Sequence, residues 1–264
     1  MMHNWKTACT CLILSLSVPL GAALCHAAPA ADSQQAAARL RIGWATADIT
    51  PDQPVVIAGG SAARLSEGIQ TPISATALAM ESIRDDGTAD MVIMVSLDLV
   101  GVTEVLYGRV QDLVRAATPQ VDVDKIILNA THTHTAPDQG TAPDLARMHS
   151  AYGIDVPADW ATWGIDLGVM PAGQYIEFAA ERIATAIHEA WEARKPGGIS
   201  FGLSYATTGR NRLTAYHDGT SEMYGDANRS DFSHVEGYED HSLGLLYTWD
   251  EQGALTGVVI NIAM

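Results

Sequence analysis

The sequence predicts an α/β domain in which a mixed β-sheet core is flanked by helices in a sandwich-like arrangement. Short apolar runs typical of strands alternate along the chain with two segments of helical spacing, and this order places helices against a sheet. The turn Asp85-Asp-Gly87 lies between two apolar runs and indicates a hairpin, so part of the sheet should be antiparallel. The last apolar run ends just before Met264, and we therefore expect a fold that is incomplete at the C-terminus.

Strands are predicted where a short run is apolar or alternates in polarity and turn residues end it. We expect them at residues 42–48, 75–83, 91–98, 126–130, 199–206, 243–249 and 255–263. The first run ends at Thr50-Pro51, and the third is so apolar that it predicts a central strand. The last two runs are joined by the turn Asp250-Glu-Gln-Gly253. Residues 55–70 are rich in Gly, Ala and Ser, which predicts a loop.

Two helices are predicted by apolar residues spaced three or four apart. The first covers residues 105–117 and the second residues 171–194. Their apolar stripes consist of Leu106, Val110, Leu113 and Val114 in the first, and Ile176, Ala180, Ile183, Ile187 and Trp191 in the second. Pro171 suits the first turn of the second helix, and Pro196-Gly-Gly198 follows its end.

The first residues have the features of an export signal. Lys6 precedes a mostly apolar stretch, residues 9–24, and small residues follow it. We therefore expect residues 1–28 to be a secretory signal peptide, residues 29–39 a flexible spacer and residues 40–264 the folded part of the chain. The mature protein should be exported, and either periplasmic or secreted.

Composition narrows the classes of partner and of metal site. Removing Lys6 with the leader leaves 14 basic against 31 acidic residues, a formal net charge of −17. Nucleic acids and anionic lipid surfaces attract basic proteins, so this charge argues against both. All three cysteines lie in the leader, which excludes cysteine catalysis and cysteine zinc sites from the mature chain. Any metal must be held by His, Asp, Glu or Tyr.

A pair of histidines follows the predicted strand at residues 126–130. They are His132 and His134, within Asn129-Ala-Thr-His-Thr-His-Thr-Ala-Pro137. If the chain stays extended past the strand, residues i and i+2 point to the same side, and both imidazoles face one pocket. Such a pair fits the start of a divalent metal site, usually for zinc, and it equally fits two ordinary surface histidines in a loop.

Other polar side chains are candidates to support these rings. The hydroxyls of Thr131, Thr133 and Thr135 can orient ring nitrogens through hydrogen bonds. Asp98 ends the predicted central strand and has two interpretations. It either accepts a hydrogen bond from a histidine or caps the helix that follows.

Four sequence segments, taken together and in order, identify a resemblance more specifically than any one of them alone. In chain order they are Gly43-Trp-Ala-Thr-Ala-Asp-Ile-Thr-Pro51, Ser96-Leu-Asp98, Asn129-Ala-Thr-His-Thr-His-Thr-Ala-Pro137 and Gly209-Arg-Asn-Arg212. In this order and rough spacing the chain resembles the N-terminal catalytic domain of neutral/alkaline, non-lysosomal ceramidases, which carry a Thr-His-Thr-His-Ser-Gly-Pro block. The resemblance covers residues 40–264, which it marks as the N-terminal part of a ceramidase-like catalytic domain. Thr135-Ala136 stands where the family has Ser-Gly.

The resemblance implies a zinc amidase that cleaves the N-acyl bond of ceramide and releases sphingosine and a fatty acid. By position, His132 matches a zinc ligand, His134 the catalytic histidine beside the metal, and Arg212 an arginine near the active site. The family's other ligands, a histidine, a glutamate and a tyrosine, are expected beyond Met264. This chain alone should therefore bind Zn²⁺ poorly and be inactive. A lipid-like substrate also implies transient contact with a membrane surface.

Two alternatives stay open. The first keeps the metal site and changes the substrate to another lipid or small amide, or to an ester. The second is a non-catalytic exported binding domain or an inactive fragment. Neither composition nor motifs specify an acyl-chain length or an oligomeric state.

Overall fold

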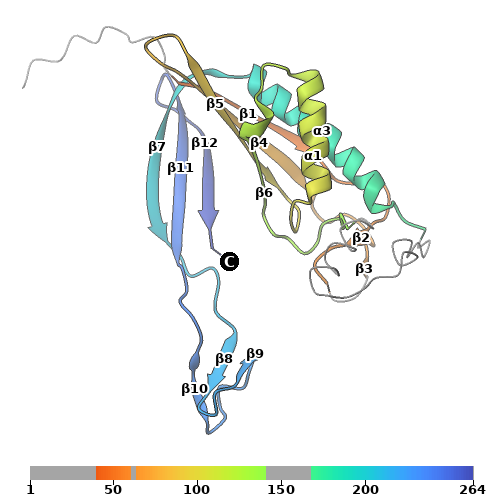
Figure 1. The fold of residues 1–264 in the computed structure, drawn as a ribbon, viewed down its shortest axis with the longest axis vertical. Coiled ribbons are helices and arrows are strands. Elements are labelled where there is room, and N and C mark those ends of the chain that lie inside the picture. The colour runs from red at the N-terminus through yellow and green to blue at the C-terminus, as the bar shows by residue number, and fades with distance from the viewer. Residues whose placement is uncertain (1–39, 61–63, 141–167, 264) are drawn as a thin grey trace, which may run out of the picture. The chain divides into compact units, whose positions relative to one another are not determined.

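The computed structural model describes residues 40–60, 64–140 and 168–263. The predicted signal peptide and spacer lie outside these residues. The main sheet has seven strands in the order β12-β11-β7-β1-β4-β5-β6 (Figure 1). Its strands are β1 (Leu40–Asp48), β4 (Ser74–Ile83), β5 (Ala89–Leu97), β6 (Ile126–Ala130), β7 (Lys195–Tyr205), β11 (Ser242–Asp250) and β12 (Leu255–Ile262).

The sheet is mixed, as predicted. All of its neighbouring strands are antiparallel except β5 and β6, which are parallel. Parallel neighbours need a crossover, and the segment between β5 and β6 supplies it with α1 (Glu104–Ala117) and the short 3₁₀ helix η1 (Val123–Lys125). The predicted α/β class is therefore confirmed.

Two helices cover one face of the strands β1, β4 and β5. Helix α3 (Ala172–Glu192) packs on β1 and β4, and α1 packs beside α3 (Figure 1). The predicted apolar stripes are the faces that the helices bury, with Leu113 only partly buried. Small residues on β4 and branched ones on β5 face these helices, and all are buried: Ala75, Ala77, Ala79, Ile93, Val95 and Leu97. No helix of the described residues is long and apolar enough to cross a membrane.

The structure corrects two sequence expectations. Residues 55–70 were expected to be a loop, but they contain the short paired strands β2 (Val56–Ile57) and β3 (Arg64–Leu65). Strand β7 begins at Lys195 rather than at residue 199, because its first residues pair with the start of β1. Apolar periodicity could not predict the β2–β3 pair or the start of β7, because backbone pairing rather than side-chain burial defines these strands.

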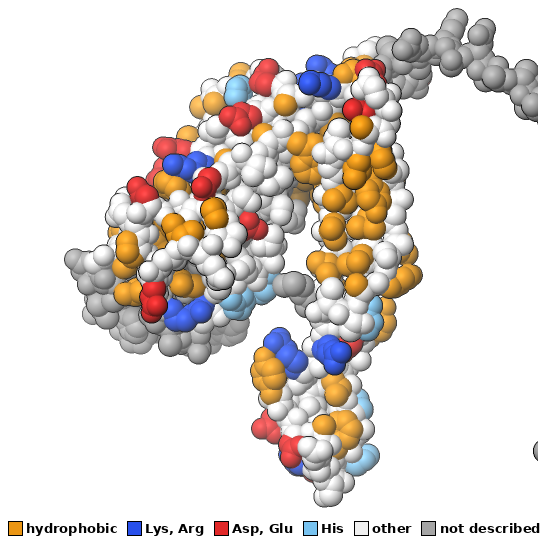
Figure 2. Space-filling model, turned by 180° about the vertical axis from the view of Figure 1, so that it is seen from behind, with side chains coloured by type: hydrophobic (Ala, Val, Ile, Leu, Met, Phe, Trp, Pro, Cys, Tyr) orange, Lys and Arg blue, Asp and Glu red, His pale blue; other side chains and the backbone are white. Residues whose placement is uncertain are grey.

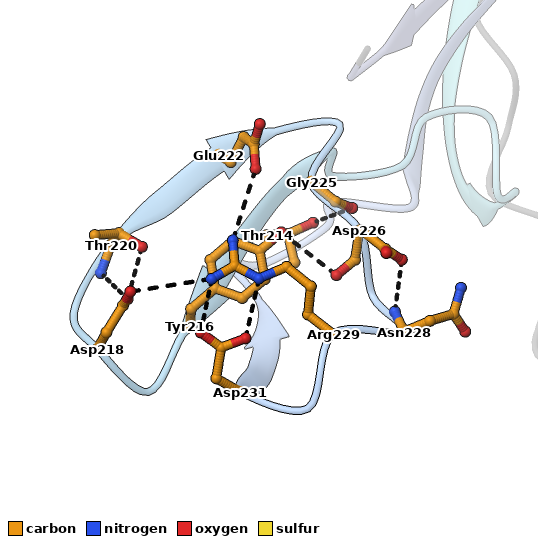
Figure 3. A network of polar contacts seen from close by, with 10 residues as sticks. All are labelled: Thr214, Tyr216, Asp218, Thr220, Glu222, Gly225, Asp226, Asn228, Arg229 and Asp231. Carbon is orange, nitrogen blue, oxygen red and sulfur yellow. Dashed lines mark hydrogen bonds and ion pairs between the residues drawn. The ribbon is translucent and has the colours of Figure 1, made fainter.

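A second sheet lies between β7 and β11 along the chain. It consists of β8 (Leu213–Tyr216), β9 (Ser221–Met223) and β10 (Phe232–Val235), in the order β10-β8-β9. Arg229, between β9 and β10, lies at the centre of a polar network (Figure 3), where its guanidinium covers the Tyr216 ring and forms two hydrogen bonds to Asp231. Polar contacts thus take much of the place of an apolar core here.

The strands β7 and β12 present apolar side chains to solvent (Figure 2). On β7, Phe201, Leu203 and Tyr205 alternate along the strand and are 66–76% exposed. On β12, Leu255 and Ile260 are more than half exposed. The three β7 side chains lie on one face of their strand because side chains alternate with a period of two.

Candidate functional site

The predicted histidines lie where two parallel strands end. The register of β5 and β6 pairs Leu97 with Ala130, so the segments that follow both strands leave the sheet at the same edge. Asp98 follows β5, and the histidine segment follows β6. The carboxyl ends of parallel strands are a common position for binding sites in α/β folds.

His132 is held by a backbone carbonyl. Its Nδ1 lies 2.7 Å from the carbonyl oxygen of Val100, in the segment between β5 and α1. A carbonyl only accepts hydrogen bonds, so Nδ1 carries the proton, and the neutral ring leaves its lone pair on Nε2. Histidines that bind metals commonly donate their second ring nitrogen to a carbonyl or carboxylate in this way.

The chain does not stay extended through the histidines. His132 has φ of 62°, in the left-handed region, where a residue other than glycine is uncommon and strained. The two rings nevertheless meet edge to face, with centroids 5.1 Å apart at an interplanar angle of 75°. The predicted pairing therefore arises from a local turn rather than from the assumed strand geometry.

The ring nitrogens fit a shared metal ion. Nε2 of His132 and Nε2 of His134 are 3.5 Å apart, and both residues are exposed to solvent. Two nitrogens that each lie 2.0–2.1 Å from a tetrahedral zinc ion are separated by roughly 3.3–3.4 Å. The two rings are therefore close enough for both to lie beside one metal ion. Among the described residues, however, no group of three or more His, Cys, Asp or Glu side chains is placed to hold a metal.

Hydrogen bonds on both sides fix the histidine segment. Its Thr131 amide donates to the Leu97 carbonyl at 2.9 Å, which ties it to β5. Further along, the Ala136 carbonyl accepts from the Ala58 amide at 2.9 Å, next to β2. Arg64 of β3 donates through Nη2 to the His134 carbonyl at 2.7 Å. The histidines therefore lie on a loop that is anchored at three points.

A buried glutamine holds the segment that carries the Val100 carbonyl. Gln139 is 3% exposed, and its Nε2 donates to the Gly101 carbonyl at 2.9 Å. Its Oε1 lies 3.5 Å from both the amide nitrogen and the hydroxyl of Thr103. Gln139 thus fixes the residues directly after the carbonyl that orients His132.

The threonines and Asp98 were predicted to orient the histidine rings, and the structure corrects part of that prediction. Thr133 and Thr135 bond to each other, at 2.9 Å between their hydroxyl oxygens, rather than to a ring nitrogen. Asp98 does not cap the following helix, since the hydroxyl of Thr103 accepts from the Leu106 amide in that role.

Asp98 instead joins β4 to the histidine segment. Its Oδ2 accepts from the amide and the hydroxyl of Ser74, both at 2.9 Å. Its Oδ1 lies 3.5 Å from the Thr131 hydroxyl. Asp98 therefore reaches the histidines through Thr131 and not by direct contact with a ring.

A pocket of about 670 Å³ lies next to the histidine loop. Thr133 and Thr135, which alternate with the histidines, line it together with Asp98. Several prolines and branched residues complete its wall, among them Pro51, Pro54, Val55, Ile57, Ile69, Pro72, Ile73 and Pro137. The histidine loop thus contributes two threonines to the wall of a partly apolar pocket.

Arg212 lies in a different environment. It precedes β8 and lines a second pocket, of about 480 Å³, together with Arg210 and Glu239. Its Nη1 donates to the Tyr224 hydroxyl at 2.6 Å, and no hydrogen bond or ion pair within the described residues joins it to either histidine. The Asn211 amide donates to Glu239 and, with a further bond from His241, holds the pKa of that carboxyl below its usual range. The assignment of Arg212 to the active site stays a prediction.

Comparison with known proteins supports the fold. No protein-family model matches the chain, and a search of curated proteins found no match. Two similar solved structures are the neutral ceramidase from Pseudomonas aeruginosa, with a TM-score of 0.61, and a ceramidase complexed with C2, with a TM-score of 0.59. Each is 20% identical over 86% of this chain, which spans only 32% and 31% of their respective lengths. The chain therefore has a ceramidase-like fold.

Proposed function

We propose that this chain is part of a metal-dependent hydrolase that cleaves N-acyl amide bonds, with ceramide as its substrate and sphingosine and a fatty acid as products. The observation that carries the proposal is the histidine pair at the ends of β5 and β6. The proton on Nδ1 of His132 leaves Nε2 as a lone-pair donor, 3.5 Å from Nε2 of His134. The ceramidase-like fold gives additional support, and it favours ceramide among amide substrates.

His132 would hold the metal, and His134 would act beside it. Bound Zn²⁺ supplies a Lewis acid and lowers the pKa of a water to about 7. Nε2 of His134 faces the same point as Nε2 of His132, so it is placed to take or give a proton there. We propose that the further metal ligands come from outside the described residues, and that Arg212 stabilises developing negative charge on the substrate.

The test is hydrolysis of an amide panel by the complete gene product. The panel contains ceramide, short N-acyl amides and a matched ester, and the variants are His132→Ala, His134→Ala and a control. His217→Ala is the control because His217 is exposed and its ring makes no hydrogen bond within the described part of the chain. We expect ceramide cleavage that is lost with His132→Ala and His134→Ala and kept in the control.

The other outcomes separate the alternatives. Cleavage of the ester or short amides in preference to ceramide would retain the metal site and replace the substrate. Full activity of His132→Ala would contradict the proposed role of the histidine pair. Binding of ceramide without turnover by the wild type would favour a non-catalytic binding domain.

A further inference from the structure

We propose that Gly59 and Arg64 are positioning residues for His134, the first acting on its ring and the second on its backbone. The inference rests on the proposed function for its catalytic meaning, and the placement of the ring can be tested without a metal or a substrate. Gly59 follows β2, and Arg64 is the first residue of β3. Neither residue belongs to the sequence motifs from which the histidine site was predicted.

Gly59 contacts the imidazole of His134 so closely that no side chain fits between them. A Cβ atom at Gly59 would lie 2.5 Å from both Cγ and Nδ1 of the ring and 3.0 Å from the Cβ of His134. Real Cβ atoms essentially never approach other heavy atoms below 3.0 Å. The glycine backbone therefore forms a wall against which the ring lies.

This wall matters because His134 has little else to orient its ring. His132 donates from Nδ1 to a carbonyl, whereas within the described residues Nδ1 of His134 makes no hydrogen bond. Among the described residues, the single polar contact of its ring is the one between Nε2 and Nε2 of His132. Gly59 blocks the Nδ1 edge, so that Nε2 is the nitrogen that faces the partner ring.

Arg64 fixes the backbone of the same residue. Its Nη2 donates to the carbonyls of His134, at 2.7 Å, and of Ala58, at 3.1 Å. Because Arg64 pairs with Ile57 across β2 and β3, the guanidinium joins this hairpin to the histidine loop. A planar guanidinium with several donors can bridge two carbonyls, and an ammonium group reproduces this only in part.

The structure offers a matched control for the glycine. Gly87 has the same φ of 83° as Gly59, but no atom of the described residues lies within 4 Å of the Cβ that a substitution would add. Alanine at either position carries the same left-handed backbone strain. The difference between Gly59→Ala and Gly87→Ala therefore isolates the collision with the His134 ring.

The experiment measures ring contacts and zinc affinity in the two variants. The ring contact is the nuclear Overhauser effect between the His132 and His134 imidazole protons in metal-free protein. Zinc affinity is measured by isothermal titration with ZnCl₂. We expect Gly59→Ala to lose the ring contact while zinc affinity changes by less than about tenfold, the low end for residues that support a metal ligand, because His132 and not His134 is proposed to hold the metal. Gly87→Ala should keep both.

Arginine variants provide the second test, and they decide the question if Gly59→Ala does not fold. Arg64→Ala should weaken the ring contact, Arg64→Lys should restore part of it, and Arg109→Ala should have no effect. Arg109 is a suitable control because it pairs with Glu177 on the helices.

Unchanged ring contacts in both Gly59→Ala and Arg64→Ala would overturn the proposal. If the complete gene product binds no zinc, the proposed function fails, while the ring contacts still show whether these residues position His134.

Discussion

Gln139 gives a sharp test of how the fold positions His132. The substitution Gln139→Met keeps the length of the side chain and removes both of its hydrogen-bonding groups. The Gly101 carbonyl then loses its 2.9 Å donor in a partly buried environment. Leaving such a group without a partner costs about 1–3 kcal/mol, and we expect the free energy of unfolding to fall by that amount.

The Gln139→Met substitution should also change the tautomer of His132. Gly101 follows Val100, whose carbonyl holds the Nδ1 proton of His132, so a looser segment should allow the ring a mixture of tautomers. Urea unfolding measures the loss of stability, and ¹⁵N NMR of the imidazoles measures the tautomer. Gln111→Met is the matched control, because its amide donates to the Val123 carbonyl at 3.1 Å, between α1 and η1.

We expect both glutamine variants to lose stability and only Gln139→Met to change the tautomer of His132. A Gln139→Met protein that is destabilised like the control but keeps the Nδ1 proton in place would refute the reasoning. The carbonyl of Val100 would then be fixed by the strand and helix ends alone.

Two further predictions concern stability. Tyr175→Phe removes the hydroxyl that donates to the Ile49 carbonyl at 3.1 Å in the core, so urea unfolding should show a loss of about 1–3 kcal/mol, and an unchanged midpoint would contradict this. Arg229 donates to Asp231 and holds its pKa below the ordinary value of 3.8; Arg229→Gln should raise that pKa, as measured by NMR of the carboxyl carbon. A depressed carboxyl pKa contributes stability above pH 3.8, and this stability is lost as the pH falls through the lowered pKa. The free energies of unfolding of wild type and variant should therefore converge in acid. A difference that stays constant with pH would contradict this.

Much of the fold could be predicted because burial leaves a periodic pattern. Strand β6 has the predicted bounds, and α1 differs from its predicted range by one residue, since apolar residues in both face a single core. Strands β8, β9 and β10 were missed because polar contacts around Arg229 hold them (Figure 3). A signal was present, however, in the Asp218-Gly219 turn between β8 and β9, where Gly219 has φ of 83°.

Only the histidine side chains of the site could be predicted from the sequence. The spacing of His132 and His134 identified the pair, but the groups that orient them are a backbone carbonyl, at Val100, and a glycine, Gly59. Neither carries a side-chain pattern that marks such a role. The left-handed turn at His132 could not be predicted either, because histidine tolerates this conformation without requiring it.

The most direct test of the central claim follows the imidazole nitrogens of His132 and His134 in the complete gene product by ¹⁵N NMR while ZnCl₂ is added. The account predicts that metal-free His132 carries its proton on Nδ1, and that zinc shifts its Nε2 resonance while this proton stays. The ring signals of His134 should move in the same titration, and those of the exposed His217 should not. A proton on Nε2 of His132, or zinc binding that leaves both rings unchanged, would contradict the account.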